Sequence, residues 1–242
     1  MPNRVKFSMA LLLGHRGANR QYLENTMPAF EAAIAAGLDG IELDVQRTQD
    51  GVLVVHHDFH LPDGRLIAAL NYQDLRLPNG YSVPKLEEVL RWAKHRGVYV
   101  NVEIKLETIS TDGREREVAA LVERMGVGEQ VIISSFNPFS LLRVRYHAPA
   151  LETALLYYHS PKTPWWLRDA LTAPLLGVAA IHPHHSLVTA QLMQKTKQRG
   201  WKVNVWTVNE AQDVARLLEL GVDGIIGDLP EVLLAQRNLP FS

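Results

Sequence analysis

The amino-acid sequence predicts an α/β fold in which eight β/α units close into a single (β/α)8, or TIM, barrel over residues 1–242. Short apolar runs typical of strands alternate with amphipathic runs typical of helices along the whole chain. The length of 242 residues is close to the roughly 250 residues of a typical barrel. Several expected strands are almost wholly apolar, as strands buried on both faces of a parallel sheet are. These observations favour one large domain over two small ones.

Nine segments have the pattern of a strand. They are Ala10–His15, Gly40–Gln46, Val52–His57, Val98–Lys105, Val131–Phe136, Glu152–Tyr158, Gly177–His182, Lys202–Val208 and Gly224–Gly227. The turn-forming stretch Thr48–Gly51 separates the second from the third, so we expect Val52–His57 to extend its predecessor as a hairpin. The eight strands that remain match the eight units of a closed barrel, which favours the barrel over a doubly wound open sheet.

Segments with helical periodicity separate these strands. The clearest helices are Pro28–Ala36, Lys85–Arg96 and one that begins at Asn209 as the N-cap and ends at Gly221. The others are expected at Arg114–Met125, Pro138–His147, Trp165–Leu171, Thr189–Arg199 and Glu231–Gln236. The stretch Leu61–Pro84 has no clear periodicity, and we expect a loop on the active-site side there that could act as a lid.

Composition excludes several classes of function. The net charge of −1 provides no basic field for nucleic acid or for an anionic membrane surface. The chain has no cysteine, which excludes disulfides, thiolate nucleophiles and Cys-ligated metal sites. No apolar run approaches the ~18–20 residues of a membrane span, and the start lacks the features of a signal peptide. We therefore expect a cytoplasmic protein without stable membrane insertion; the sequence leaves the oligomeric state open.

Three carboxylates stand at the ends of two expected strands. Glu42 and Asp44 are separated by one residue, so both side chains point to one face of their strand. Such a pair repels unless a cation or a basic group lies between the two charges, or unless both simply face water. Glu103 adds a third carboxylate on the next barrel strand. Three oxygen ligands without sulfur suit one hard divalent cation, Mg²⁺ or Ca²⁺, with Mn²⁺ tolerated.

Histidines and basic residues accompany these carboxylates. His15 and His57 are candidates for acid–base chemistry, because histidine titrates near neutral pH. His56 and His57 face opposite sides of an extended strand, and periodicity alone does not choose between them. Arg16 offers a planar fork to a phosphate group. Lys105 either reaches the same phosphate or pairs with a neighbouring carboxylate and does nothing more.

Other polar and aromatic residues leave alternatives open. The run His182-Pro183-His184-His185 has the composition of a metal motif, yet it lies in a polar turn beyond an expected strand. His182 is a better candidate for a contact with the site than His184 or His185. Trp206 points to one face of a late strand, either as part of the barrel core or as a wall for the substrate. The sequence contains no Gly-x-Ser-x-Gly, P-loop or dinucleotide-binding glycine motif.

Together these segments resemble the glycerophosphodiester phosphodiesterase family over about residues 10–237. The similar stretches are His15–Gly17, Glu24–Thr26, Ala29-Phe30, Gly37–Val45, Thr48–Gly51, His57-Asp58, Pro84–Leu90, Asn101–Lys105, Ser134–Phe136, Val205–Asn209 and Gly221–Ile226. The resemblance implies a TIM barrel that hydrolyses small glycerophosphodiesters to glycerol 3-phosphate and an alcohol. Cleavage of the lysophospholipase D or sphingomyelinase D type, and a non-catalytic module that binds a phosphate ligand, are the alternatives.

The resemblance also implies roles for the candidate residues. Glu42, Asp44 and Glu103 would hold the metal, His15 and His57 would be the acid–base pair, Arg16 and Lys105 would bind phosphate, and Asn25 would support the substrate site. Apart from the resemblance, we expect Trp206 among the substrate-binding residues. The chain departs from the family pattern in three places. Leu23 replaces a proline, the loop that follows His57 is shortened, and the usual late Thr-Asp is Gly227-Asp228. The shortened loop flanks the site and leaves the substrate preference open.

Overall fold

The computed structural model describes residues 10–106, 108–159 and 170–237. Its sheet has the order β1-β9-β8-β7-β6-β5-β4-β2-β3, and pairing of β1 with β2 closes it into a barrel. The barrel strands are β1 Leu11–His15, β2 Gly40–Arg47, β4 Tyr99–Ile104, β5 Val131–Ser135, β6 Glu152–Tyr157, β7 Ala180–Pro183, β8 Lys202–Val205 and β9 Gly224–Gly227. Strand β3, Leu53–Val55, pairs antiparallel with β2. The predicted TIM barrel and its hairpin extension are thus confirmed.

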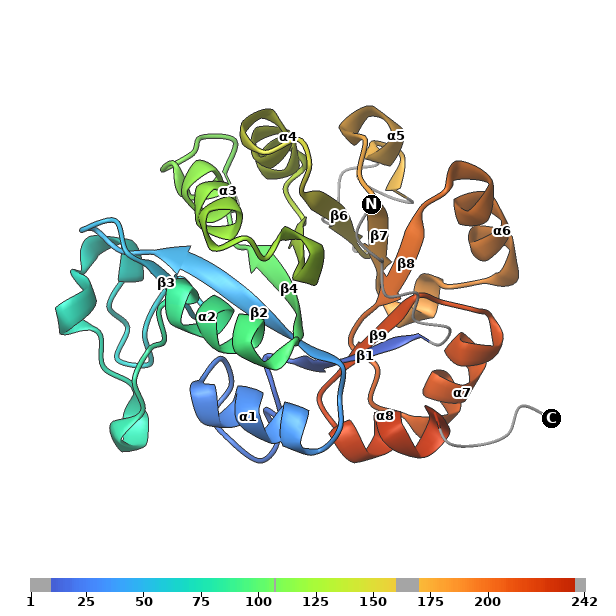
Figure 1. The fold of residues 1–242 in the computed structure, drawn as a ribbon, viewed down its shortest axis with the longest axis horizontal. Helices are drawn as coiled ribbons and strands as arrows, with labels where there is room; N and C mark the ends of the chain where they lie inside the picture. Colours follow the sequence, from blue (N-terminus) through green and yellow to red (C-terminus); the bar gives the residue numbers. More distant parts are fainter. Residues whose placement is uncertain (1–9, 107, 160–169, 238–242) are drawn as a thin grey trace.

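Helices surround the strands, as Figure 1 shows. They are α1 Met27–Ala35, α2 Leu86–Arg96, α3 Arg114–Met125, α4 Pro138–His147, α5 Ala173–Leu176, α6 Ala190–Arg199, α7 Ala211–Glu219 and α8 Pro230–Arg237. Their ends follow the expected chemistry: Gly97 ends α2 in the left-handed conformation, with φ 67°. The Thr189 side chain caps α6 by accepting a hydrogen bond from the backbone N–H of Leu192.

Several predicted boundaries are wrong, and one predicted helix is only partly described. Strand β3 ends at Val55 instead of His57, and β8 ends at Val205 instead of Val208. Strand β7 starts at Ala180 because Gly177, with φ 59°, ends helix α5 instead of opening the strand. Asn209 does not cap α7, which begins at Ala211 with Glu210 as the N-cap residue. The Asn209 side chain bonds to Asp228 instead. Residues 165–169 of the helix expected at Trp165–Leu171 lie outside the described residues.

The stretch Leu61–Pro84 is irregular, as predicted, but it is packed. It contains three short 3-10 turns, η1 Ile67–Ala69, η2 Tyr72–Asp74 and η3 Pro78–Gly80. A small apolar cluster of its own is formed by Val54, Leu61, Ile67, Leu75 and Val83. The backbone N–H of Tyr72 donates to the Asp50 carboxylate, and that of Gln49 donates to the carbonyl of Leu70. The stretch is therefore a packed extension of the β2–β3 hairpin.

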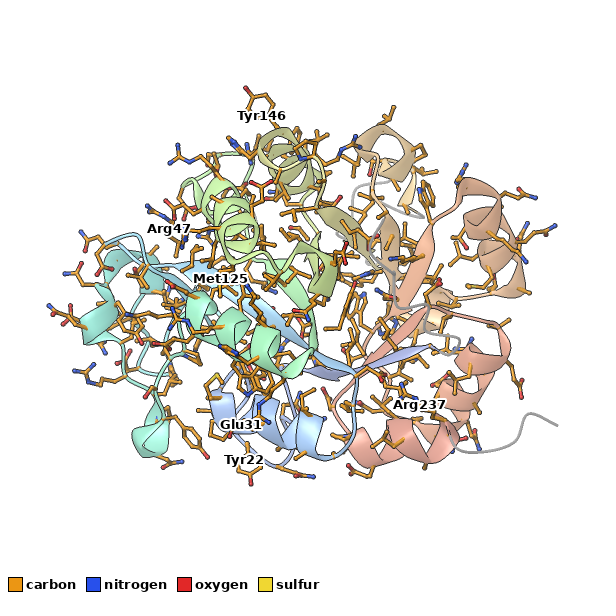
Figure 2. All side chains as sticks on the ribbon, in the orientation of Figure 1. Tyr22, Glu31, Arg47, Met125, Tyr146 and Arg237 are labelled. Carbon is orange, nitrogen blue, oxygen red and sulfur yellow. The ribbon has the colours of Figure 1, made fainter. Side chains whose placement is uncertain are left out.

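Side chains fill the barrel and the layer between barrel and helices (Figure 2). Inside the barrel, Ile132, Ala154 and Ala180 form an apolar cluster on which Tyr99 packs, near the N-terminal ends of the strands. The main core lies between strands and helices and is almost wholly buried. At the periphery, Tyr146 points away from α4 and is 83% exposed. Among the described residues, no helix is both long enough and apolar enough to cross a bilayer.

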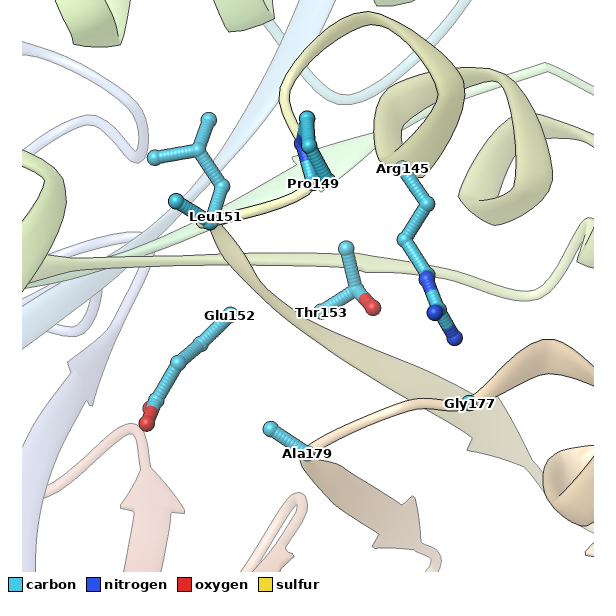
Figure 3. Close-up of a pocket in the computed structure, with 8 residues that line it drawn as sticks. Arg145, Pro149, Leu151, Glu152, Thr153, Gly177 and Ala179 are labelled. Carbon is cyan, nitrogen blue, oxygen red and sulfur yellow. The ribbon is translucent and has the colours of Figure 1, made fainter.

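A pocket of about 220 Å³ opens at the N-terminal ends of β6 and β7 (Figure 3). It is lined by Arg145, Pro149, Ala150, Leu151, Glu152, Thr153, Gly177 and Ala179. The Arg145 guanidinium donates to the carbonyl of Leu176 at 2.7 Å and is thereby engaged. Because TIM-barrel enzymes place their chemistry at the C-terminal ends of the strands, this pocket lies at the opposite end from the expected site.

Candidate active site

The structure brings the three predicted carboxylates together at the C-terminal end of the barrel. Asp44 of β2 and Glu103 of β4 are register partners on neighbouring strands, and Glu42 lies one step below Asp44 on the same face. One oxygen from each side chain lies within 4.8 Å of the others. The residues are only 3%, 1% and 9% exposed for Glu42, Asp44 and Glu103. The group can hold a metal ion, since it offers three converging oxygen ligands.

Burial and mutual repulsion disfavour three charges in this group. Burial, followed by the charges of Asp44 and Glu103, raises the pKa of Glu42 well above its usual value. Burial and the Asp44 charge raise the pKa of Glu103 to about 7, although Lys105 opposes the change. A divalent cation would remove this repulsion by lying between the oxygens. The donor set and its electrostatics therefore fit a hard cation.

Arg16 and Asn25 hold the carboxylates from one side. The backbone N–H of Arg16 donates to Glu42 at 3.0 Å, and its guanidinium lies 3.3 Å from Asp44. The Asn25 amide donates to Asp44 at 2.9 Å and accepts from the Asp44 backbone at 3.3 Å. Arg16 and Asn25 both have positive φ, 54° and 56°, a conformation uncommon outside glycine. The guanidinium of Arg16 also binds both oxygens of Glu24, a partner that no local sequence pattern indicates.

His57, rather than His56, faces the carboxylate group. Its Nδ1 donates to Asp58 at 2.7 Å, and its Nε2 lies 3.2 Å from the ammonium of Lys105. Lysine has no acceptor, so Nε2 accepts this hydrogen bond and the ring is neutral. Burial and the positive charges of Lys105 and Arg16 lower the pKa of His57, while Asp44 opposes the shift. The Nδ1 atom of His56 contacts the carbonyl of Asp58 instead.

Lys105 connects this histidine to the carboxylates. Its ammonium lies 3.1 Å from Glu103 and 3.8 Å from Asp44. This position is compatible both with an ion pair to a carboxylate and with contact to a phosphate in the site.

Two buried residues, Arg114 and Gln46, hold the backbone of Lys105 and His57 in place. Arg114 donates to the Lys105 carbonyl and to the amide oxygen of Gln46. The Gln46 amide in turn donates to the His57 carbonyl at 3.1 Å.

His15 lies on the other side of the group. Its Nε2 is 4.0 Å from Glu42, and its Nδ1 is 2.7 Å from Asp228. Burial opposes ionisation of Asp228, but hydrogen bonds from His15 and Asn19, among others, hold the pKa of Asp228 well below its usual range. No local sequence pattern assigns a role to Asp228. Its signal was a carboxylate directly after the last strand and two residues before a proline.

Aromatic rings surround Trp206 at the ends of β5 to β8. Its ring centroid lies 5.4 Å from that of Phe136, 6.2 Å from Tyr158 and 5.3 Å from His184, in edge-to-face contacts. The indole N–H donates to the carbonyl of His182 at 2.8 Å. Trp206 is partly buried and belongs to this aromatic cluster, at the same end of the barrel as the carboxylates.

The remaining histidines of the His182–His185 run have different places. His182 is fully buried inside the barrel, 3.0 Å from the amide of Asn204. Burial lowers the pKa of His182 to about 3, so its ring is neutral. His185 lies 3.5 Å from Asp213 on the outer side. Among the described residues, none of these histidines joins the carboxylates that could hold a metal.

Comparison with known proteins places this site in a family. The model of the glycerophosphoryl diester phosphodiesterase family matches residues 15–232. A glycerophosphodiester phosphodiesterase of Caldanaerobacter subterraneus is 35% identical over 93% of this chain and 96% of its own. A candidate glycerophosphoryl diester phosphodiesterase of Silicibacter pomeroyi has a TM-score of 0.83 and 28% identity, covering 99% of this chain and 97% of its own.

A further solved structure carries a ligand. It is an Oleispira antarctica phosphodiesterase in complex with the product sn-glycerol 3-phosphate, with a TM-score of 0.80 and 25% identity, covering 96% of this chain and 98% of its own. Sequence and fold thus agree over nearly the whole chain, and the matched region contains both histidines and all three carboxylates. The chain belongs to the glycerophosphoryl diester phosphodiesterase family.

Proposed function

We propose that this protein hydrolyses glycerophosphodiesters to glycerol 3-phosphate and an alcohol, using one divalent cation and two histidines. The observation that carries the proposal is the arrangement of His15 and His57 beside the buried carboxylate group. Each ring binds an aspartate through Nδ1. The other ring nitrogen, Nε2, lies beside the site in both histidines. It is 4.0 Å from the Glu42 carboxylate in His15 and 3.2 Å from the Lys105 ammonium in His57. A phosphoryl group held between the rings would meet a proton donor and a proton acceptor.

Glu42, Asp44 and Glu103 would hold the cation, Mg²⁺ or Ca²⁺. Bound there, it would supply positive charge to a non-bridging phosphate oxygen. Two observations support a cation here. Three carboxylate oxygens converge, and burial together with the neighbouring negative charges raises the pKa values of Glu42 and Glu103. Asn25 supports the proposal because its amide fixes the orientation of the Asp44 carboxylate. Supporting hydrogen bonds of this kind set ligand geometry in metal sites.

The two histidines would divide the proton transfers. His57 is neutral and has a lone pair at Nε2, so it would accept the proton of the attacking hydroxyl, either a hydroxyl of the glycerol moiety or water. The new bond forms between that oxygen and phosphorus, and the bond from phosphorus to the alcohol breaks. His15, as an imidazolium whose Nδ1–H is bound by Asp228, would donate its Nε2 proton to the departing oxygen. When the glycerol hydroxyl attacks, a cyclic phosphate forms, and water then opens it with the histidine roles reversed.

Arg16 and Lys105 would stabilise the negative charge on the phosphoryl oxygens. Both cations lie beside the carboxylate group, with Lys105 on the His57 side. Arg16 already uses its guanidinium for Glu24, which holds the side chain in place before substrate arrives. Cations that are fixed in advance stabilise developing charge without reorganisation during the reaction.

The aromatic cluster around Trp206, at the ends of β5 to β8, would form a second wall of the substrate site beside the carboxylates and histidines. Phe136, Tyr158 and His184 contact Trp206 and keep its ring in place. Such a wall would suit the apolar part of the alcohol or of the glycerol moiety. It is also the observation that keeps lysophospholipid cleavage as a second candidate. The product bound in the Oleispira antarctica enzyme, sn-glycerol 3-phosphate, supports the small diester as the main substrate.

Turnover of glycerophosphocholine and of lysophosphatidylcholine by the purified protein tests the proposal. We expect release of glycerol 3-phosphate from the former, loss of turnover with EDTA, and recovery with added Mg²⁺ or Ca²⁺. Faster cleavage of lysophosphatidylcholine would favour the second candidate. Binding of glycerol 3-phosphate without turnover of either diester, in the presence of metal, would contradict the enzyme and favour a binding module.

A further inference from the structure

We propose that Asp228 is a positioning residue that orients His15 for the reaction, and that Asn209 and Asn19 hold Asp228 in place for this task. The inference rests on the proposed function, in which His15 transfers a proton through Nε2. Asp228 would hold the ring so that Nε2 faces the substrate. Asp228 directly follows β9, and His15 is the last residue of β1. The two residues are 213 positions apart in the chain.

The geometry fixes one tautomer of the His15 ring. Nδ1 lies 2.7 Å from Oδ1 of Asp228. An ionised carboxylate only accepts hydrogen bonds, so Nδ1 carries a proton in both the neutral ring and the imidazolium, and the proton that His15 gives or takes is the one at Nε2. Nε2 then points toward the carboxylate group, 4.0 Å from Glu42. The ring is thereby oriented before substrate binds, as a general acid or base requires.

Donors surround the Asp228 carboxylate. Asn19 donates to Oδ1 at 2.7 Å, and Asn209 donates to Oδ2 at 2.8 Å. Arg20 adds a contact to Oδ2 at 3.2 Å from an exposed side chain. Asn19 also donates to the backbone carbonyl of His15 at 2.9 Å, so one amide fixes the carboxylate and the histidine together. This number of donors is compatible only with an ionised carboxylate.

Asn209 fixes the backbone of Asp228 as well as its side chain. The amide oxygen of Asn209 accepts the backbone N–H of Asp228 at 2.9 Å, while its nitrogen donates to the carboxylate. Gly227 makes this approach possible, because a Cβ at this position would lie 2.3 Å from the carbonyl oxygen of Val208. The close approach of β9 to Val208 at this position therefore depends on a glycine.

The second histidine has a much weaker support. Asp58, which binds Nδ1 of His57, is the next residue in the chain, and its side chain is 74% exposed against 10% for Asp228. A buried carboxylate with several donors confines its partner more tightly than an exposed one that can turn into water. The structure therefore gives His15 the more rigid of the two aspartate contacts.

A double-mutant cycle tests whether Asp228 acts through His15. We expect Asp228→Asn to lower kcat by at least about 10²-fold, as loss of histidine orientation does in other enzymes. We expect KM and metal affinity to stay within about twofold. In a His15→Ala background the same substitution should change kcat less than about threefold, because the effects of two residues that act as one unit do not add. Asn209→Ala should follow the same pattern with a smaller loss.

The matched control is Asp223→Asn, the same change near the other end of β9. The Asp223 carboxylate accepts from the backbone N–H of Val203, far from the site, so this variant should lose thermal stability but keep kcat. A spectroscopic readout separates the inference from the proposed function. In imidazole ¹⁵N spectra, the neutral form of His15 in the wild-type protein should carry its proton at Nδ1, and in Asp228→Asn the neutral form should be a mixture of tautomers.

The outcomes are distinct. Wild-type kcat in Asp228→Asn, or equal losses in the wild-type and His15→Ala backgrounds, would overturn the inference and leave the proposed function standing. The same holds if the neutral form of His15 carries its proton at Nε2 in the wild-type spectrum. If the wild-type protein hydrolyses no glycerophosphodiester, the proposed function fails, and the ¹⁵N spectra still decide whether Asp228 orients His15.

Discussion

The ammonium of Lys105 lies 3.2 Å from Nε2 of His57 and favours the neutral form of that imidazole. Burial first, and then the charges of Lys105 and Arg16, lower the pKa of His57 below its usual value of 6.5. The base form of His57 therefore persists to lower pH than it would in an exposed histidine. This relationship makes the acid limb of the pH profile a test of the proposed general base.

We expect kcat/KM to fall on the acid side only below about pH 6.5. In Lys105→Met the limb should move to higher pH, because one of the charges that disfavour imidazolium is gone, and KM should rise because a phosphate contact is lost. The measurement is the pH profile of kcat/KM for glycerophosphocholine at a metal concentration that saturates the protein at every pH. An acid limb at the same pH in both proteins would contradict the account of Lys105.

The neighbouring histidines of the β3 end provide a matched pair of variants. His57→Ala should lower kcat by about 10²–10⁴-fold, the usual effect of acid–base catalysis, and so should His15→Ala. His56→Ala should leave kcat within about threefold, because its ring contacts the carbonyl of Asp58 and not the carboxylate group. Steady-state kinetics with matched melting temperatures check this. Equal losses in His56→Ala and His57→Ala would argue against the choice between the two rings.

Metal affinity should depend on pH through the carboxylate group. The pKa of Glu103 is raised to about 7, so in the metal-free protein a proton competes with the cation below that pH. Affinity should then rise by up to about tenfold per pH unit between pH 5 and 7 and level off above. Calorimetric titration with Mg²⁺ or Ca²⁺ in buffers of different ionisation enthalpy would detect the released proton. An affinity that is constant over this range would contradict the coupling.

The same shift affects the stability of the metal-free protein. A carboxyl whose folded pKa exceeds its unfolded value of about 4.3 binds more protons in the folded state, so stability falls as pH rises from about 4.3 to 7. Added metal should reverse the trend. Thermal unfolding with EDTA and with metal, at several pH values, measures both curves. The Glu103→Gln variant should lose the pH dependence that Glu103 contributes.

Asn25 allows backbone strain and metal support to be separated. Its φ of 56° is left-handed, and its amide fixes Asp44. Asn25→Ala and Asn25→Gly should both weaken metal binding by about 10–100-fold, because both lose the support of Asp44. Asn25→Ala should in addition be less stable than Asn25→Gly by about 1 kcal/mol, the cost of a left-handed alanine. Chemical unfolding and metal titration of the two variants test each part, and equal stabilities would show that strain at this position is negligible.

Much of the fold and of the site follows from local patterns in the sequence. Spacing by two residues placed Glu42 and Asp44 on one face, and parallel pairing of β2 with β4 brought Glu103 beside them. The choice of His57 over His56 came from the family resemblance, since an extended strand offers both faces equally. The structure now shows which ring contacts Lys105.

What local patterns could not provide are contacts made by closure of the barrel. Asp228 meets His15 because β9 pairs with β1, and no periodicity links residues 213 positions apart. Asparagine is favoured at helix N-caps, but the side chain of Asn209 makes tertiary hydrogen bonds to Asp228 instead. Gly177 stands before an apolar run and could open a strand, yet its left-handed φ is used to end α5.

A crystal structure with Mg²⁺ or Ca²⁺ and glycerol 3-phosphate would test the central claim most directly. We predict one cation bound by oxygens of Glu42, Asp44 and Glu103 at about 2.0–2.6 Å, with the phosphate within hydrogen-bond distance of both His15 and His57. A cation held elsewhere, or a phosphate that contacts neither imidazole while the carboxylates remain metal-free at saturating concentration, would contradict it.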